Sequence, residues 1–296
     1  MRTLLRRSFT GLFIVGVILA GLLINSLSFF LVFLSIMIVT LWEFYRLAHM
    51  IKVRPQVHLG LFMAVLLFTL IFLLSIRSIN IKYLTLLLVF FPFVFINELF
   101  AKHNRPYHNI AYTFLGLIYI ALPFSLLPLL SFDMHEKMQT FFTLEGEEDI
   151  LNFLLQPGYV IDYSPYPVIG IFIIIWLYDT GAYITGMLWG KHKLFRRISP
   201  GKSWEGVVGG TVIALATGII LSSRFREMNR TEWILIVFVI VFFGTMGDLA
   251  ESMLKRKAGV KDSSHILPGH GGFLDRFDGF LLAVPVIVTL IEFFKV

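Results

Sequence analysis

Apolar runs of about twenty residues follow one another along nearly the whole chain, separated by short polar segments. A helix needs about 20 apolar residues to cross the hydrocarbon core of a bilayer. Of the 296 residues, 57% are hydrophobic and 15% are charged, whereas soluble domains contain about a quarter charged residues. We therefore predict an all-α, polytopic integral membrane protein. About nine membrane-spanning helices are expected, over residues 8–24, 27–48, 57–76, 82–100, 110–131, 167–189, 206–222, 231–254 and 278–295.

The distribution of Lys and Arg predicts the orientation, because cytoplasmic loops carry an excess of both. With nine helices and the N-terminus in the cytoplasm, 18 of the 25 Lys and Arg residues fall in inner segments and 7 in outer ones. Adding or removing one helix would divide the basic loops between the two sides. The first two apolar runs are expected to form a retained helical hairpin rather than a cleaved signal peptide, since no convincing A-x-A site follows the first.

This topology divides the chain into three regions. Residues 1–131 are expected to form five helices, and residues 132–166 an acidic loop on the outer side of the cell membrane. Residues 167–296 contain two polar, Gly-rich loops, 190–205 and 255–277, which both fall on the cytoplasmic side. Whatever these loops bind must therefore come from the cytosol or the inner leaflet.

The predicted helix 231–254 ends in a polar stripe. Asp248, Glu251, Ser252 and Lys255 are spaced i, i+3, i+4 and i+7, so they share one helix face. A charged side chain at the centre of a bilayer costs about 2.5–3.5 kcal/mol on insertion scales, so Asp248 needs a partner. An internal ion pair between Glu251 and Lys255 remains an alternative explanation for those two residues.

A second carboxylate, Asp179, lies near the middle of the predicted helix 167–189. It has no cationic neighbour on its own helix, so its stabiliser must be a bound cation or an Arg or Lys from another segment. Gly186 and Gly190 form a small-xxx-small spacing on the same helix, which is more typical of a packing seam than of a site.

Two further acids, Asp275 and Asp278, lie three residues apart where the last helix begins, with Arg276 between them. Capping of the helix N-terminus is an alternative role for Asp278. Capping does not explain two acids beside the sequence PGHGG. In that sequence Gly269, Gly271 and Gly272 would let backbone N–H groups approach an anion, and His270 could donate to a phosphate or bind a metal.

The two helices that carry these acids are joined at one membrane edge, so Asp248, Asp275 and Asp278 are expected to converge there. Carboxylate oxygens suit Mg²⁺, whose remaining ligands are usually substrate phosphates and water. Basic side chains surround the acids: Lys255, Arg256, Lys257, Lys261 and Arg276. Acids for a metal and bases for phosphate on one loop indicate phosphoryl or nucleotidyl transfer.

The other loop, KHKLFRRISPGKSWEG, supplies five basic side chains and leads into the predicted helix 206–222. A helix N-terminus with Ser203 near the cap suits an anion. We expect a binding site at Lys202, Ser203, Trp204 and Glu205. The other cations, Lys191, Lys193, Arg196 and Arg197, are explained equally well by topology or by contact with anionic lipid.

The stretch SMLKRKAGVKDSSHILPGHGGFLDRFD, residues 252–278, closely resembles the signature of the phosphatidate cytidylyltransferases, also called CDP-diacylglycerol synthases. It has the S-x-x-K-R opening, the K-D pair, the P-G-H-G-G turn and the D-R-x-D end. The segments DTGAYITGMLWGKHKL and SPGKSWEGVVGG are also similar to that family, although Gly201 and Ser203 depart from its usual S-P-K-K-T-W-E-G. The resemblance covers the chain from about residue 167 onward.

The resemblance implies transfer of a cytidylyl group from CTP to phosphatidate, with Mg²⁺ as cofactor and a monovalent cation (K⁺) beside it. It implies CTP, phosphatidate and membrane lipids as partners, a homodimer, and no nucleic acid. The metal ligands would be Asp248, Asp275 and Asp278. The residues expected in catalysis are Asp248, Lys255, Arg256, Lys261, Asp262, His270, Asp275, Arg276 and Asp278. Those expected to bind substrates are Asp179, Lys202, Ser203, Trp204, Glu205, Ser252, Gly271 and Gly272.

Two other functions stay open at this point. A CTP-dependent lipid kinase, such as a polyprenol kinase, would use similar substrates but would transfer the γ-phosphate. A cation or lipid transporter would use Asp179 and Asp248 as acids along its pathway. Interrupted helices at corresponding places in two halves of the chain would favour a transporter, and the sequence has no such pattern.

Overall fold

The computed structural model describes residues 2–76, 78–132, 163–269 and 271–294, and these residues are predominantly helical. The elements are α1 (Arg2–Ile24), α2 (Ser26–Met50), α3 (Val57–Ser75), η1 (Ile81–Thr85), α4 (Leu86–Ala101), α5 (Pro106–Gly116), η2 (Leu117–Ala121), α6 (Leu122–Ser131), α9 (Tyr166–Trp189), β1 (Lys193–Phe195), β2 (Ser199–Ser203), α10 (Trp204–Arg224), α11 (Arg230–Val239), η3 (Ile240–Gly244), α12 (Thr245–Lys257) and α13 (Leu274–Phe294). Among them, η1 is a 3₁₀ turn, while η2 and η3 are π-helical segments that continue into α6 and α12.

Each apolar run predicted from the sequence coincides with a helix in the described part of the chain. By length and composition, seven of the described helices can cross a membrane: Ser26–Met50, Val57–Ser75, Ile81–Ala101, Pro106–Ser131, Tyr166–Trp189, Trp204–Arg224 and Arg230–Lys257. The apolar part of α1, Thr10–Ile24, is shorter. The prediction of an all-α, polytopic membrane protein is therefore confirmed. The number nine and the orientation of the N-terminus stay predictions.

Side-chain caps explain where several helices begin. The side chain of Asn25 accepts a hydrogen bond from Ser28 N (2.8 Å), and Ser28 Oγ accepts one from Asn25 N (3.0 Å). This reciprocal capping box separates α1 from α2 with a single residue. Asn229 and Glu232 form a second capping box at the start of α11. Ser203 caps α10.

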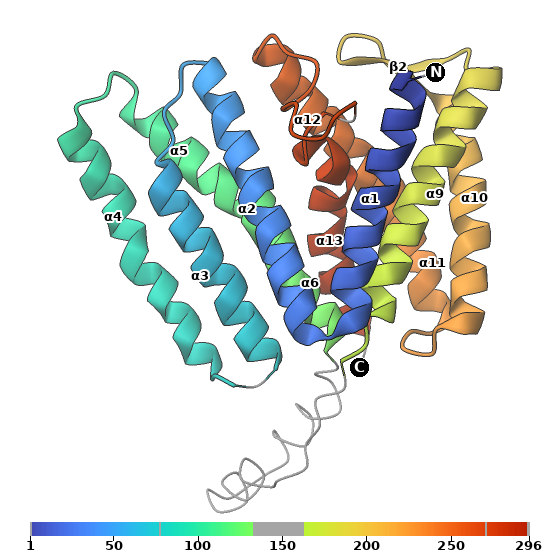
Figure 1. The fold of residues 1–296 in the computed structure, drawn as a ribbon, viewed down its shortest axis with the longest axis horizontal. Coiled ribbons are helices and arrows are strands. Elements are labelled where there is room, and N and C mark those ends of the chain that lie inside the picture. The colour runs from blue at the N-terminus through green and yellow to red at the C-terminus, as the bar shows by residue number, and fades with distance from the viewer. Residues whose placement is uncertain (1, 77, 133–162, 270, 295–296) are drawn as a thin grey trace, which may run out of the picture.

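The last helix, α13, packs between two halves of the molecule (Figure 1). We call α1–α6 the N-terminal half and α9–α12 the C-terminal half. On one side α13 contacts α2, η2 and α6, and on the other it contacts α11, η3 and α12. The ring of Phe280 lies 5.0 Å from that of Phe124 in α6 and stacks at 5.5 Å on that of Phe172 in α9. Aromatic packing therefore fixes α13 against both halves.

A two-stranded antiparallel hairpin, β1–β2, is the exception to the all-α prediction within the described residues. It lies in the predicted loop 190–205 and pairs Lys193 with Ser203. The N-terminus of α1, this hairpin and the segment after α12 all lie at one end of the bundle (Figure 1). Most of the predicted acidic loop, 132–166, falls outside the described residues.

Helices α9 and α10 pack closely through glycine. A Cβ atom at Gly181 would lie 3.3 Å from Gly210 Cα, and one at Gly186 would lie 3.5 Å from Gly206 Cα. Larger side chains at these positions would separate the two helices. Gly186 thus lies at a packing seam, as the small-xxx-small spacing indicates.

Candidate active site

A cavity of about 680 Å³ opens between α9, the β-hairpin, α10, α12 and α13. It joins segments that are far apart in the sequence. The polar and charged residues that line it are Tyr178, Asp179, Tyr183, Lys193, Lys202, Ser203, Thr245, Asp248, Asp275, Arg276 and Asp278. Apolar residues of the same helices, such as Ile175 and Ile240, form the rest of its wall. A cavity that combines charged groups with an apolar wall suits a ligand with a polar head and an apolar tail.

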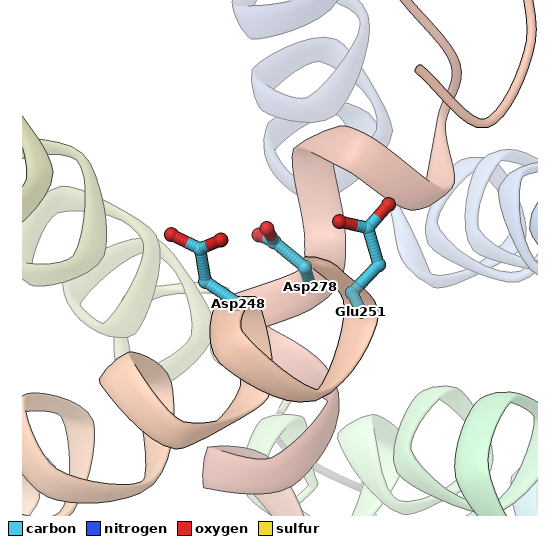
Figure 2. A group of neighbouring side chains, drawn as sticks. All are labelled: Asp248, Glu251 and Asp278. Atoms are coloured by element: carbon cyan, nitrogen blue, oxygen red, sulfur yellow. The ribbon is translucent and has the colours of Figure 1, made fainter. Parts of the chain in front are cut away.

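Three carboxylates lie close together beside this cavity: Asp248 from α12 and Asp278 from α13 line it, and Glu251 from α12 is buried next to them. One oxygen atom of each lies within 4.8 Å of an oxygen of the other two. Figure 2 shows Asp278 between the other two side chains. We call these three residues the carboxylate cluster. The π-helical segment η3 directly precedes the helix turn that carries Asp248, and such π segments are frequent at functional sites.

The carboxylate cluster is only partly satisfied by the protein. Glu251 is fully buried, and its Oε2 lies 2.5 Å from Lys255 Nζ. Its Oε1 has no hydrogen-bond partner among the described residues. Asp278 Oδ1 accepts from Gly279 N (2.7 Å), and Asp248 forms an ion pair with Lys202. A buried carboxylate oxygen without a protein partner is costly, so the cluster is suited to binding a cation.

This arrangement fits a divalent cation. The cluster offers several oxygen atoms and no nitrogen or sulfur, which is the ligand set that Mg²⁺ prefers. Among the described residues, Lys202 and Lys255 form ion pairs with the cluster, and Lys255 is shared with Asp275. The carboxylates therefore outnumber their ammonium partners, and a divalent ion would balance the charge.

Asp275, which the sequence predicts as a metal ligand, lies outside the carboxylate cluster. Its Oδ1 lies 2.6 Å from Lys255 Nζ, and its Oδ2 accepts from Ser263 N (2.8 Å), Ser263 Oγ (2.9 Å) and Gly272 N (2.7 Å). Both oxygens are thus engaged by the protein. The structure places Asp275 next to the cluster, as the group that orients Lys255, and brings Glu251 into the cluster.

The second predicted loop contributes Lys202 and Ser203 to the cavity. Lys202 reaches across from β2 to Asp248. Ser203 Oγ accepts from Gly206 N (3.2 Å), which makes it the N-cap of α10. Trp204 is 57% exposed, and Glu205 pairs with His192 (2.6 Å). Trp204 and Glu205 do not line this cavity, and their roles in substrate binding stay predictions.

Asp179 lies on the same cavity wall as Tyr183, one helical turn away. The cavity also holds Lys202 and Arg276, which are cations from other segments. This agrees with the prediction that a cation from another segment stabilises Asp179. Ser252, another residue expected to bind substrate, donates from its hydroxyl to Asp248 Oδ1 (3.3 Å).

The segment between α12 and α13 forms a second hollow of about 490 Å³. Its lining residues are Lys261, Asp262, His265, Leu267, Pro268, Gly269, Gly271 and Arg276. Arg276 borders both hollows, so the two adjoin at that side chain. Arg256 is exposed and lines neither of them. The predicted role of His270 falls on a residue outside the described part of the chain.

The glycines of this segment divide into two roles. Gly269 and Gly271 both have φ of 81°, a left-handed conformation that favours glycine. Gly271 lines the second hollow, as a turn that approaches an anion would. In contrast, the backbone N–H of Gly272 donates to Asp275, so this group is engaged by the protein.

Two residues that the structure brings to the site were missed as site residues in the sequence. Glu251 shares a helix face with Asp248, and this spacing could have indicated a site residue. An ion pair with Lys255, however, was enough to explain an acid at this position. Glu43 lies in the apolar run 27–48 and accepts hydrogen bonds from the segment before α13. The only signal for Glu43 was an acid inside an apolar helix.

The fold and the cavity define the class of protein. It is a polytopic membrane protein whose helices carry a carboxylate cluster suited to a divalent cation, close to Lys and Arg side chains suited to phosphate. A family model described as "Cytidylyltransferase family" matches residues 5–294, and the chain belongs to this family.

Three relatives that carry the name phosphatidate cytidylyltransferase match part of the chain. The protein from Staphylococcus saprophyticus is 49% identical over 122 residues, which is 40% of this chain and 46% of that protein. The one from Haemophilus influenzae is 47% identical over 120 residues, 39% of this chain and 42% of its own length. The one from Staphylococcus aureus strain COL is 48% identical over 122 residues, with 40% and 46% covered. The chain thus spans less than half the length of these relatives.

Proposed function

We propose that this protein transfers the cytidylyl group of CTP to phosphatidate, giving CDP-diacylglycerol and pyrophosphate for phospholipid biosynthesis. Membership of the cytidylyltransferase family and the names of the relatives support this proposal. The observation that carries it is a cavity lined by Asp248 and Asp278 of the carboxylate cluster together with Lys202 and Arg276, with the buried Glu251 next to the two acids. A nucleotide and a phospholipid would both find complementary groups there.

The transfer reaction does not need a general base from the protein. A phosphate monoester is largely dianionic at neutral pH, because its second pKa is about 6. Its oxygen can attack the α-phosphorus of CTP directly, forming the new P–O bond while the bond to pyrophosphate breaks. The protein must hold two anions in line and offset their repulsion, which is positioning and electrostatic stabilisation.

The side chains divide these tasks. A bound Mg²⁺ would supply charge neutralisation of the triphosphate, and Asp248, Glu251 and Asp278 would hold it. We propose that Lys202 and Arg276 bind phosphate oxygens in the cavity. Lys261 and Gly271 would bind phosphate in the adjoining hollow, beyond Arg276.

The side of the membrane, the oligomeric state and the second cation are proposals of the same kind. We propose that the cavity opens to the cytoplasmic side of the cell membrane, which the excess of Lys and Arg in the same segments supports. We also carry forward the homodimer and the monovalent cation (K⁺), which rest on the resemblance alone.

The test is the fate of labelled CTP. Purified protein with phosphatidate and Mg²⁺ is expected to place label from α-labelled CTP, but not from γ-labelled CTP, into lipid. Removal of the divalent ion with a chelator should abolish the transfer, and added Mg²⁺ should restore it. Incorporation of the γ-label would show a lipid kinase instead, and full activity in chelator would contradict the role of the carboxylate cluster.

The variant Lys202→Met tests the proposed phosphate contact. A lost hydrogen bond to a charged group costs about 1.5–3 kcal/mol, so the KM for CTP should rise about 10- to 100-fold. The matched control is Lys191→Met, an exposed lysine of the same segment that lines neither hollow. Unchanged KM and kcat in Lys202→Met would place the triphosphate elsewhere.

A further inference from the structure

Glu43 is a buried acid in the N-terminal half. It lies in α2, and its relative exposure is 0%. No cation forms an ion pair with it among the described residues. Four donors satisfy its carboxylate instead, and all come from the segment that precedes and begins α13: Ser263 Oγ (3.0 Å), Ser264 Oγ (2.5 Å), Phe273 N (3.1 Å) and Leu274 N (2.8 Å).

Two of these donors are backbone N–H groups at the start of α13. The first N–H groups of a helix have no partner within the helix and favour a negative charge. Glu43 therefore acts as an N-terminal cap supplied by another helix. Since Asp275 and Asp278 lie in the first turns of α13, the direction of this helix start determines where their side chains point.

A chain of contacts continues from Glu43 to the carboxylate cluster. The hydroxyl of Ser263 lies between two carboxylates, 3.0 Å from Glu43 Oε2 and 2.9 Å from Asp275 Oδ2, and donates its one proton to one of them at a time. The backbone N–H of Ser263 donates to Asp275 Oδ2 as well (2.8 Å). Asp275 contacts Lys255 Nζ (2.6 Å), which in turn contacts Glu251 (2.5 Å). Each link is a charged or charge-assisted contact, so a displacement of Ser263 is transmitted to Lys255.

The packing around Glu43 leaves little room for adjustment. A Cβ atom added at Gly272 would collide with Ser263 Oγ and with the carboxylate of Glu43. The segment thus closes directly onto the acid. The contact is a fixed one between the N-terminal half and the start of α13.

We propose that Glu43 is a positioning residue for the transfer reaction. It holds Ser263, Ser264 and the start of α13 so that Asp278 joins the carboxylate cluster and Lys255 faces Glu251. Through this acid the N-terminal half takes part in the reaction without touching either substrate. The inference rests on the proposed function, since it assigns Glu43 a role in that same site.

The test is Glu43→Gln, which keeps the shape of the side chain but places an NH₂ group against two of its four donors. Loss of a partner that orients metal ligands typically costs about 10- to 100-fold in activity or metal affinity. We expect kcat to fall by about that factor. The Mg²⁺ concentration for half-maximal activity should rise about tenfold, with little change in the KM for CTP.

The matched control is Glu98→Gln. Glu98 is also buried (3% exposed) and lies in the same half, but its carboxylate contacts Asn109 (2.6 Å), His103 (2.9 Å) and Gln56 (3.4 Å) and none of the residues that donate to Glu43. This variant should keep the Mg²⁺ dependence of the wild type. If Glu43→Gln does not fold, Ser264→Ala removes a single donor to Glu43 and tests the same Mg²⁺ dependence with a smaller disturbance.

The outcomes are distinct. An altered Mg²⁺ dependence in Glu43→Gln or Ser264→Ala, absent from Glu98→Gln, supports the inference. A wild-type Mg²⁺ dependence in both would overturn it, even if stability is lowered, because a merely structural residue would give that result. If the wild-type protein makes no CDP-diacylglycerol, the proposed function fails first, and the wild-type assay alone reveals this.

Discussion

The variant Asp278→Asn is expected to lose at least about 100-fold in kcat, because removal of one preorganised electrostatic stabiliser typically costs 10²–10³ in rate. Asp278 lies between the other two members of the carboxylate cluster (Figure 2). Asparagine keeps the size of the side chain but removes the charge that a divalent ion needs. The measurement is transfer of α-labelled CTP to phosphatidate under saturating Mg²⁺.

The control for this variant lies on the same helix. Glu292→Gln makes the same carboxylate-to-amide change near the other end of α13, where the side chain is exposed. It should retain wild-type activity. An Asp278→Asn protein that folds and keeps more than a tenth of the activity would contradict a metal-binding role for the cluster.

The variant Lys255→Met is expected to have the second largest effect, and on stability as well as on activity. Lys255 contacts both Glu251 and Asp275, whose side chains are 0% and 5% exposed. Removing one partner of a buried ion pair typically costs about 3–5 kcal/mol, because the remaining charge is left unpaired. The thermal midpoint in detergent should fall accordingly, and transfer should be lost.

A double variant separates the two effects. Adding Glu251→Gln to Lys255→Met removes one of the two unpaired charges and should recover part of the lost stability. Activity should remain absent, since the cluster then lacks a carboxylate. Equal thermal midpoints for Lys255→Met and the wild type would show that the ion pairs contribute nothing to stability, contrary to this account.

The helices were predictable because each apolar run is long enough to cross a bilayer, and the bilayer leaves the backbone few alternatives to a helix. The local departures from a regular α-helix, and the structure of the segments between helices, were harder to predict from the sequence. The π-helical segments η2 and η3 change the direction of side chains inside helices that read as continuous apolar stretches. The β-hairpin depends on contacts of the 190–205 segment with α9 and α10, which no local pattern specifies.

The carboxylate cluster was predictable in part. Asp248 and Asp278 were expected to meet because α12 and α13 are joined at one end of the bundle. Whether Glu251 or Asp275 completes the cluster depends on how the intervening segment folds. In the structure, backbone N–H groups of that segment occupy Asp275, and this arrangement requires the left-handed conformation of Gly271.

Glu43 shows a different limit of sequence reasoning. Its partners Ser263 and Ser264 are 220 and 221 residues away, so no local spacing connects them. An acid in an apolar helix indicates that some partner must exist. Which partner it is depends on the packing of α2 against α13, and only the three-dimensional structure gives that information.

The central claim is that Asp248, Glu251 and Asp278 hold the divalent ion of the reaction. The most direct measurement is an anomalous difference map at the manganese edge, from crystals of the protein grown with Mn²⁺ and CTP. The account predicts a peak bounded by carboxylate oxygens of these three residues. A peak held by Asp275 or Asp262 instead, or none near the cavity, would contradict it.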